Sequence, residues 1–224
     1  QMPYQTVGDL TLDFAPSPNI GNYRRELDLD NATATVSYTA DGVRFTREVF
    51  ASAPDHVIIV RLSADKPGAL SCSAGMKTPM KATVGTEGRD TLVMNGTGGD
   101  HGGVKGQIRY QSRVRVMTSG GQVSAENGRV TVSKADQALL LIAAATSFKK
   151  YDDVSGDPEA IVKSRITEAA GKGYAKLLAA HIADYQPLFR RVGIDLGTTD
   201  AVKLPIDERI RRFSAGNDPL LAAL

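Results

Sequence analysis

Leu139-Leu140-Leu141-Ile142-Ala143 is apolar at five consecutive positions. Successive side chains of a β-strand point to opposite faces of its sheet, so this segment places apolar groups on both faces. A strand of this kind is typical of the middle of a sheet that is covered on both sides. We therefore expect residues 138–146 to form a central strand that is buried on both faces.

Outward from this segment, residues 8–148 alternate between apolar and polar side chains, as in Leu10, Leu12 and Phe14. The alternation is typical of strands with one buried face. Asp41-Gly42 and Asn127-Gly128 predict two-residue hairpins of type I′, and Lys66-Pro67-Gly68 predicts a third reversal. About eleven short strands without an intervening helix indicate a largely antiparallel sandwich or barrel. The expected strands are 10–14, 23–29, 33–39, 43–50, 56–63, 69–74, 91–94, 107–117, 122–125, 129–133 and 138–146.

The periodicity changes from two to that of a helix after Tyr151. Asp157-Pro158 predicts a helix that begins with an aspartate cap and runs to about residue 170. Glu159–Lys163 and Glu168–Lys172, each four residues apart, are pairs that support such a helix.

Two further helices are expected, over 174–191 and over 205–216. The first of them contains Pro187, which should kink it or restart its last turn. Asp218-Pro219 predicts another helix start shortly before Leu224. The chain thus divides into a β domain at 1–150 and a helical segment at 151–224. That segment is too short to build its own core.

The composition is that of an ordinary globular protein, with 42% hydrophobic residues, 23% charged residues and a formal net charge of +2. No apolar run approaches the ~18 residues needed to span a bilayer, so we expect no membrane partner. No basic stripe indicates a nucleic-acid partner. The single cysteine, Cys72, excludes an internal disulfide and a cysteine-rich zinc site. We predict no metal and no cofactor.

The three histidines have no metal-ligand spacing, and no hydrolase or zinc-protease motif is present. The glycine-rich segment 96–106 resembles a phosphate loop, but Val104 stands where the lysine belongs and strands flank the segment. Two interpretations of this segment stay open. It is either a plain connection between strands or a loop that reaches over a neighbouring site, where Asp100 and His101 could bind a polar ligand.

The run 151–157 is explained by turn and helix-cap chemistry, with a sugar- or cation-binding turn as the alternative. Carboxylates are plentiful, but their positions in the sequence do not show which of them converge. Arg109, Arg113 and Arg115 form a basic face on one strand, which fits either an acidic partner or a solvated strand edge.

Six segments resemble, in the same order, the amino-terminal domain of glycoside hydrolase family 95, the α-L-fucosidases. They are PYQTVGDL at 3–10, YRRELDL at 23–29, VRFTREVFAS at 43–52, YDDVSGDP at 151–158, HIADYQPLFRRV at 181–192 and LPIDER at 204–209. The resemblance implies a mainly β protein with an antiparallel β-sandwich of the super-sandwich type, followed by linker helices that lead to an (α/α)6 barrel. It also suggests a secreted or periplasmic parent.

Family members hydrolyse α-L-fucosides with inversion, and some prefer α-L-galactosides. The resemblance places the catalytic acid and base in the barrel, beyond Leu224. It implies that this chain is an interior fragment with no catalytic residue and no turnover of its own. We expect a non-catalytic domain that supports the barrel and contributes to the rim of its active site.

The candidate substrate-binding residues are Asp100 and His101, followed by Tyr4 and Gln5. The expected partners are the (α/α)6 catalytic domain and, through the parent enzyme, fucosylated or galactosylated glycans. Self-association is expected if the surface that meets the barrel is exposed. The alternative is a stand-alone carbohydrate-binding or structural sandwich without hydrolase activity. Carbohydrate modules usually present an aromatic platform, and here aromatic residues total 6% with no tryptophan.

Overall fold

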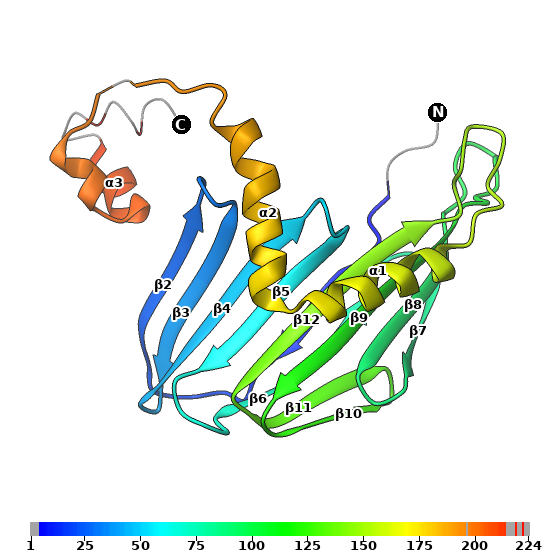
Figure 1. Cartoon of the computed structure of the whole chain (residues 1–224), viewed down its shortest axis with the longest axis horizontal. Coiled ribbons are helices and arrows are strands. Elements are labelled where there is room, and N and C mark those ends of the chain that lie inside the picture. The colour runs from blue at the N-terminus through cyan, green and yellow to red at the C-terminus, as the bar shows by residue number, and fades with distance from the viewer. Residues whose placement is uncertain (1–4, 196, 214–217, 219–220, 222–224) are drawn as a thin grey trace. The chain divides into compact units, whose positions relative to one another are not determined.

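The computed structural model describes residues 5–195, 197–213, 218 and 221. The chain forms two compact units, residues 1–186 and 187–224. The first unit contains two antiparallel sheets and the helices that follow them (Figure 1). Among the described residues, no helix has both the length and the apolar character needed to cross a membrane.

The smaller sheet has four strands in the order β1-β6-β11-β10. These strands are β1 (Asp9–Asp13), β6 (Leu70–Lys77), β11 (Arg129–Ala135) and β10 (Gln122–Glu126). The larger sheet has eight strands in the order β2-β3-β4-β5-β12-β9-β8-β7. These are β2 (Ile20–Asp28), β3 (Thr33–Ala40), β4 (Val43–Ser52), β5 (Val57–Ala64), β12 (Gln137–Thr146), β9 (Arg109–Ser119), β8 (Thr91–Thr97) and β7 (Ala82–Glu87).

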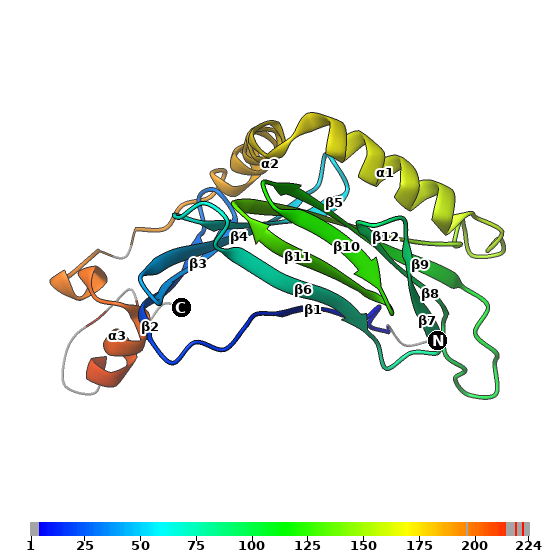
Figure 2. The same cartoon turned by 90° about the horizontal axis from the view of Figure 1, so that it is seen from below.

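The first unit has three layers, which Figure 2 shows edge-on: the small sheet, the large sheet, and the helices α1 (Pro158–Lys172) and α2 (Tyr174–Phe189). One hydrophobic core, which includes Leu140, lies between the two sheets. A second core, which includes Leu141, lies between the large sheet and the helices. Adjacent residues of β12 thus enter different cores, which confirms the prediction of a central strand buried on both faces.

The architecture is the mainly β, antiparallel sandwich with C-terminal helices that the sequence predicts. Both type I′ turns are confirmed, with positive φ at Asp41 and Gly42 and at Asn127 and Gly128. Strand β7 has no counterpart among the predicted strands. It is an edge strand, exposed at four of its six positions, so it lacks the apolar alternation that identifies a half-buried strand.

Helix α1 begins as its sequence predicts. The Asp157 carboxylate accepts a hydrogen bond from the Ala160 amide at 3.1 Å, and Glu159 pairs with Lys163 at 2.5 Å. Lys172 lies 2.5 Å from Asp55, in the turn between β4 and β5, rather than in the predicted pair with Glu168. This contact ties the end of α1 to the large sheet.

Helix α2 contacts the turn between β2 and β3 through its polar side chains. The buried His181 places Nε2 3.0 Å from the Asn31 carbonyl, so this nitrogen must carry the proton and donate it. The Tyr185 hydroxyl donates to the Leu29 carbonyl at 2.9 Å. His181 is therefore a packing residue of the helix.

In the second unit, a short 3-10 helix (Asp200–Lys203) precedes α3 (Ile206–Arg212). The rest of the helix predicted to reach residue 216 lies outside the described residues. The Asp218 carboxylate accepts from the Leu221 amide at 3.1 Å, as a helix cap does, and binds both Nε and Nη2 of Arg209 at 2.7 Å.

Candidate functional site

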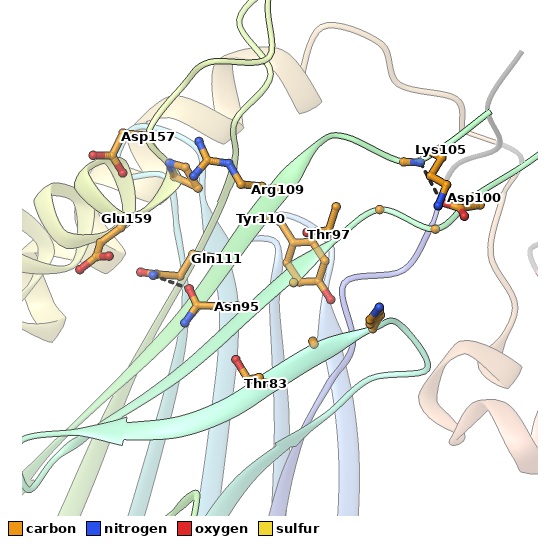
Figure 3. Close-up of a pocket in the computed structure, with 17 residues that line it drawn as sticks. Thr83, Asn95, Thr97, Asp100, Lys105, Arg109, Tyr110, Gln111, Asp157 and Glu159 are labelled. Carbon is orange, nitrogen blue, oxygen red and sulfur yellow. Dashed lines mark hydrogen bonds between the residues drawn. The ribbon is translucent and has the colours of Figure 1, made fainter.

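A cleft of about 1060 Å³ opens at one end of the large sheet (Figure 3). Its walls come from the start of β7, the end of β8, the start of β9, the glycine-rich segment and the first turn of α1. The lining residues are 81–83, 95–100, 105–106, 109–111 and 157–159. Segments that are far apart in the sequence therefore share one cavity.

Cross-strand pairing between β8 and β9 builds the centre of the cleft. Asn95 lies opposite Gln111, and the Gln111 amide nitrogen donates to the Asn95 side-chain oxygen at 2.7 Å. Gly96 lies opposite Tyr110, whose ring fills the space above the glycine. A Cβ at position 96 would lie 2.3 Å from the Tyr110 Cζ atom, so any larger residue would displace the ring.

The Tyr110 side chain is an exception to the rule that buried polar groups are paired. Tyr110 is only 7% exposed. Its hydroxyl is buried and has no hydrogen-bond partner among the described residues. Such a group is costly unless a water molecule or a ligand satisfies it.

The glycine-rich segment forms a small hairpin rather than a phosphate loop. His101 and Val104 exchange two backbone hydrogen bonds of 3.0 Å across Gly102 and Gly103, which both have positive φ. At its base, the Asp100 carboxylate accepts from the Gly106 amide at 3.0 Å. A Cβ on Gly106 would lie 1.9 Å from the Gly98 carbonyl oxygen, so this close approach requires glycine.

The structure brings three of the four predicted site residues to this segment. Asp100 lines the cleft. His101 is exposed on the hairpin and does not line the cleft. The side-chain oxygen of Gln5 accepts from the Gly99 amide at 2.9 Å, across 94 residues of sequence. Tyr4 lies outside the described residues.

The charges around the cleft are balanced. Three lining residues are cationic and three are anionic: Lys81, Lys105, Arg109, Asp100, Asp157 and Glu159. Several of them also have structural partners, because Asp157 caps α1 and Arg109 donates to the Gly156 carbonyl at 3.2 Å. The lining therefore carries equal numbers of formal positive and negative charges.

The predicted basic face of β9 is not a solvated edge, and that interpretation is wrong. β9 lies between β12 and β8, and Arg113 is only 4% exposed. Its guanidinium binds both carboxylate oxygens of Glu87 at 2.8 and 2.9 Å, which lowers the pKa of Glu87. Arg115 is 3.3 Å from Asp90. These charges are matched within the chain.

Asn95, Tyr110 and Gln111 were not among the predicted site residues. Gln111 does alternate with Arg109 and Arg113 along β9, so a polar face was visible in the sequence. Its pairing with Asn95 could not be predicted from the sequence, because it depends on the order of the strands in the sheet.

Seven described carboxyl groups have a clearly shifted pKa. A general acid for glycoside cleavage needs a raised pKa. Every described aspartate or glutamate whose pKa is clearly shifted has it lowered, by hydrogen bonds to nearby donors. The described residues also contain no group of three or more His, Cys, Asp or Glu side chains placed to hold a metal ion.

The fold and the cleft define a β-sandwich domain with helices packed on its large sheet and a polar, charge-balanced cavity at the sheet end. Residues 1–151 match the protein family described as "Glycosyl hydrolase family 65, N-terminal domain". Residues 173–224 match the one described as "Glycosyl hydrolase family 95 catalytic domain". The chain therefore belongs to the family of glycosyl hydrolase family 65 N-terminal domains, and its last part is similar to the family 95 catalytic domain.

Curated relatives agree with this family. The chain is 35% identical to "Alpha-L-fucosidase 2" of Arabidopsis thaliana, over 99% of this chain and 30% of that protein. It is 27% identical to "Probable alpha-fucosidase A" of Aspergillus niger, over 99% of this chain and 29% of that protein. The chain thus spans about 30% of the length of these relatives.

A solved structure shares the fold. It is titled "Putative kojibiose phosphorylase from human microbiome" and matches with a TM-score of 0.51 and 10% sequence identity. The match covers 76% of this chain and 25% of the solved one. At that identity the likeness concerns the sandwich architecture alone.

Proposed function

We propose that this chain is a non-catalytic part of a glycoside hydrolase that cleaves α-L-fucosides. The observation that carries the proposal is the 35% identity to an α-L-fucosidase over 99% of the chain.

In this proposal the sandwich at 1–150 supports an (α/α)6 catalytic barrel, and the helical segment at 151–224 leads to it. His181 and Tyr185 hydrogen-bond α2 to the β2–β3 turn. These bonds fix the helix on the sandwich, which supports a role for the helical segment as an ordered connection. The match to the family 95 catalytic domain begins at residue 173, next to the first residue of α2. Fucosylated or galactosylated glycans would reach the chain through the complete enzyme.

Hydrolysis of an aryl α-L-fucoside tests the proposal. We expect turnover by the complete enzyme and none above background by the 224-residue chain, because the acid and base are supplied elsewhere. Release of the aryl group is followed by absorbance for both proteins at equal concentration. Clear turnover by the chain alone would contradict the non-catalytic assignment. An inactive complete enzyme would favour a carbohydrate-binding or structural module instead.

We also propose that the glycine-rich hairpin, with Asp100, His101, Gln5 and Tyr4, contributes to the rim of the active site. Gln5 supports this role because it fastens the hairpin through the Gly99 amide. His101 is exposed at the hairpin and therefore free to meet a substrate.

Replacing His101 by alanine in the complete enzyme should lower kcat/KM roughly 3- to 10-fold, the effect of one lost hydrogen bond. His56→Ala is the matched control, since His56 is also exposed but lies in the β4–β5 turn. If both variants have the same kinetics as the unmodified enzyme, the hairpin is only a connection between strands and does not contact the substrate.

The exposed apolar residues of α3, Ile206 and Ile210, give the second unit a surface that a further domain could cover. We propose that the catalytic barrel covers it in the complete enzyme. Self-association of the chain alone through such surfaces remains a prediction.

A further inference from the structure

We infer that Asn127-Gly128, the turn between β10 and β11, is a site of spontaneous deamidation, and that the fold protects the second Asn-Gly pair, Asn95-Gly96. An asparagine before glycine is especially prone to this reaction, because glycine has no Cβ to shield its backbone nitrogen from the asparagine side chain. The two pairs share this chemistry, so a large difference between their rates has to come from the structure around them.

The reaction needs only water and hydroxide. The backbone nitrogen of Gly128 loses its proton to hydroxide and attacks the side-chain carbonyl carbon of Asn127. The new C–N bond closes a five-membered succinimide ring, and the side-chain amino group takes a proton from water and leaves as ammonia. Water then opens the ring at either carbonyl, which gives aspartate or isoaspartate. The net change consumes water and releases ammonia, and nothing is oxidised or reduced.

Both reacting groups of the turn pair are unconstrained. Asn127 is exposed, and its side chain makes no hydrogen bond to another described residue. The Gly128 amide nitrogen also donates to no other residue in the described part of the chain. The turn ends a hairpin whose strand β10 has only five residues and forms an edge of the small sheet (Figure 2). The end of a short edge hairpin opens at a low free energy, which lets the nitrogen reach the carbonyl carbon.

The second pair lies inside the large sheet. β8 pairs with β7 on one side and with β9 on the other, and Gly96 takes part in both pairings. The Asn95 side-chain oxygen accepts from Gln111 at 2.7 Å, and the Tyr110 ring lies against Gly96. The Gly96 nitrogen therefore reaches the Asn95 carbonyl carbon only when β8 separates from its neighbours. That separation costs more free energy than opening the end of the β10–β11 hairpin.

Isoaspartate in the turn would loosen the small sheet. Asn127 and Gly128 have φ values of 51° and 71°, as a type I′ turn requires. Isoaspartate adds one carbon atom to the main chain, so the turn can no longer join Glu126 to Arg129 in the same geometry. The next residue, Val130, is 0% exposed and belongs to the core between the sheets. The modification thus weakens a hairpin that covers this core.

The test is peptide mass spectrometry of the 224-residue chain after several weeks of incubation at pH 6 and at pH 8. We expect Asn127 to be converted at least about 10-fold faster than Asn95, which corresponds to a difference of about 1.4 kcal/mol in opening free energy. Conversion should be faster at pH 8, because hydroxide removes the proton from the Gly128 nitrogen. In concentrated urea the two rates should become similar, because neither pair is then held by a sheet.

Asn127→Gly is the matched control variant, because glycine adopts the positive φ of this position and carries no side-chain amide. During incubation at pH 8 the unmodified chain should become less stable, measured as a lower midpoint of urea denaturation. The variant should keep the midpoint of a fresh sample.

The inference is overturned if Asn127 stays intact through the incubation, or if Asn95 reacts as fast as Asn127 in the folded chain. It is also overturned if the difference in rate persists in concentrated urea, because the neighbouring residues rather than the fold would then cause it. Equal changes of the midpoint in the unmodified chain and in Asn127→Gly would show that deamidation of the turn does not loosen the small sheet.

Discussion

Replacement of Leu141 by alanine should destabilise the chain by about 3 kcal/mol, within the usual ~2–5 kcal/mol for a fully buried leucine. Leu141 is 0% exposed and belongs to the core between the large sheet and the helices. The same core includes Val162 of α1 and Leu177 of α2. The lost side chain would leave a cavity that rigid strands on both sides of β12 cannot close.

The free energy of unfolding, measured by urea denaturation, checks this expectation. Leu27→Ala is the matched control: it is the same substitution on a strand, but Leu27 is 63% exposed. That variant should lie within about 0.5 kcal/mol of the unmodified chain. Equal losses for the two variants would show that the helices do not form a core on the large sheet.

Removal of the Asp55 carboxylate should cost about 2 kcal/mol at neutral pH. The side chain is 1% exposed and accepts from Lys172 Nζ and from the Ser52 hydroxyl, both at 2.5 Å. Asp55→Ala leaves the buried Ser52 unpaired. The expected loss is below the ~3–5 kcal/mol of a fully buried ion pair, because the Lys172 side chain is 47% exposed and regains water.

The same pair makes stability depend on pH. Burial alone would raise the pKa of Asp55, but hydrogen bonds from Lys172 and Ser52 outweigh burial, and the pKa lies below its usual value. The contribution of Asp55 is therefore complete above its unfolded pKa of ~4 and is lost as the pH falls through the lower folded value. The pKa of Lys172 is raised by Asp55, so on the alkaline side the pair weakens only above the usual pKa of lysine.

Urea denaturation at pH 7 and pH 3 checks both parts of this expectation. The difference between the unmodified chain and Asp55→Ala should be largest at pH 7 and smaller at pH 3. Asp184→Ala, which removes an exposed aspartate of α2, is the control and should show neither effect. A difference that is independent of pH would show that the carboxylate acts only by filling space.

Much of the fold could be predicted because its signals are local. The continuous apolar run along 138–146, the turn dipeptides at 41–42 and 127–128 and the cap at 157–158 each depend on neighbouring residues, and each is found in the structure. Strand β7 could not be predicted in this way, because an exposed edge strand has no apolar face.

The candidate site was predicted only in part. Asp100 and Gln5 meet at the glycine-rich hairpin, although nothing in the sequence links position 5 to position 99. Asn95, Tyr110 and Gln111 escaped prediction because their role follows from the pairing of β8 with β9. A polar residue on a strand cannot be assigned to a site until its neighbours on the adjacent strands are known.

The sequence by itself determined the class of the protein: the period of two, the turns, the change to helices after residue 151 and the family to which these segments belong. The tertiary structure alone decided which distant residues meet. Lys172 pairs with Asp55, 117 residues away, rather than with Glu168 on its own helix. Residues from three strands and from the first turn of α1 line the same cleft. The reason is physical: local conformation depends on near neighbours, whereas a cavity depends on strand order and layer packing, which only the complete fold specifies.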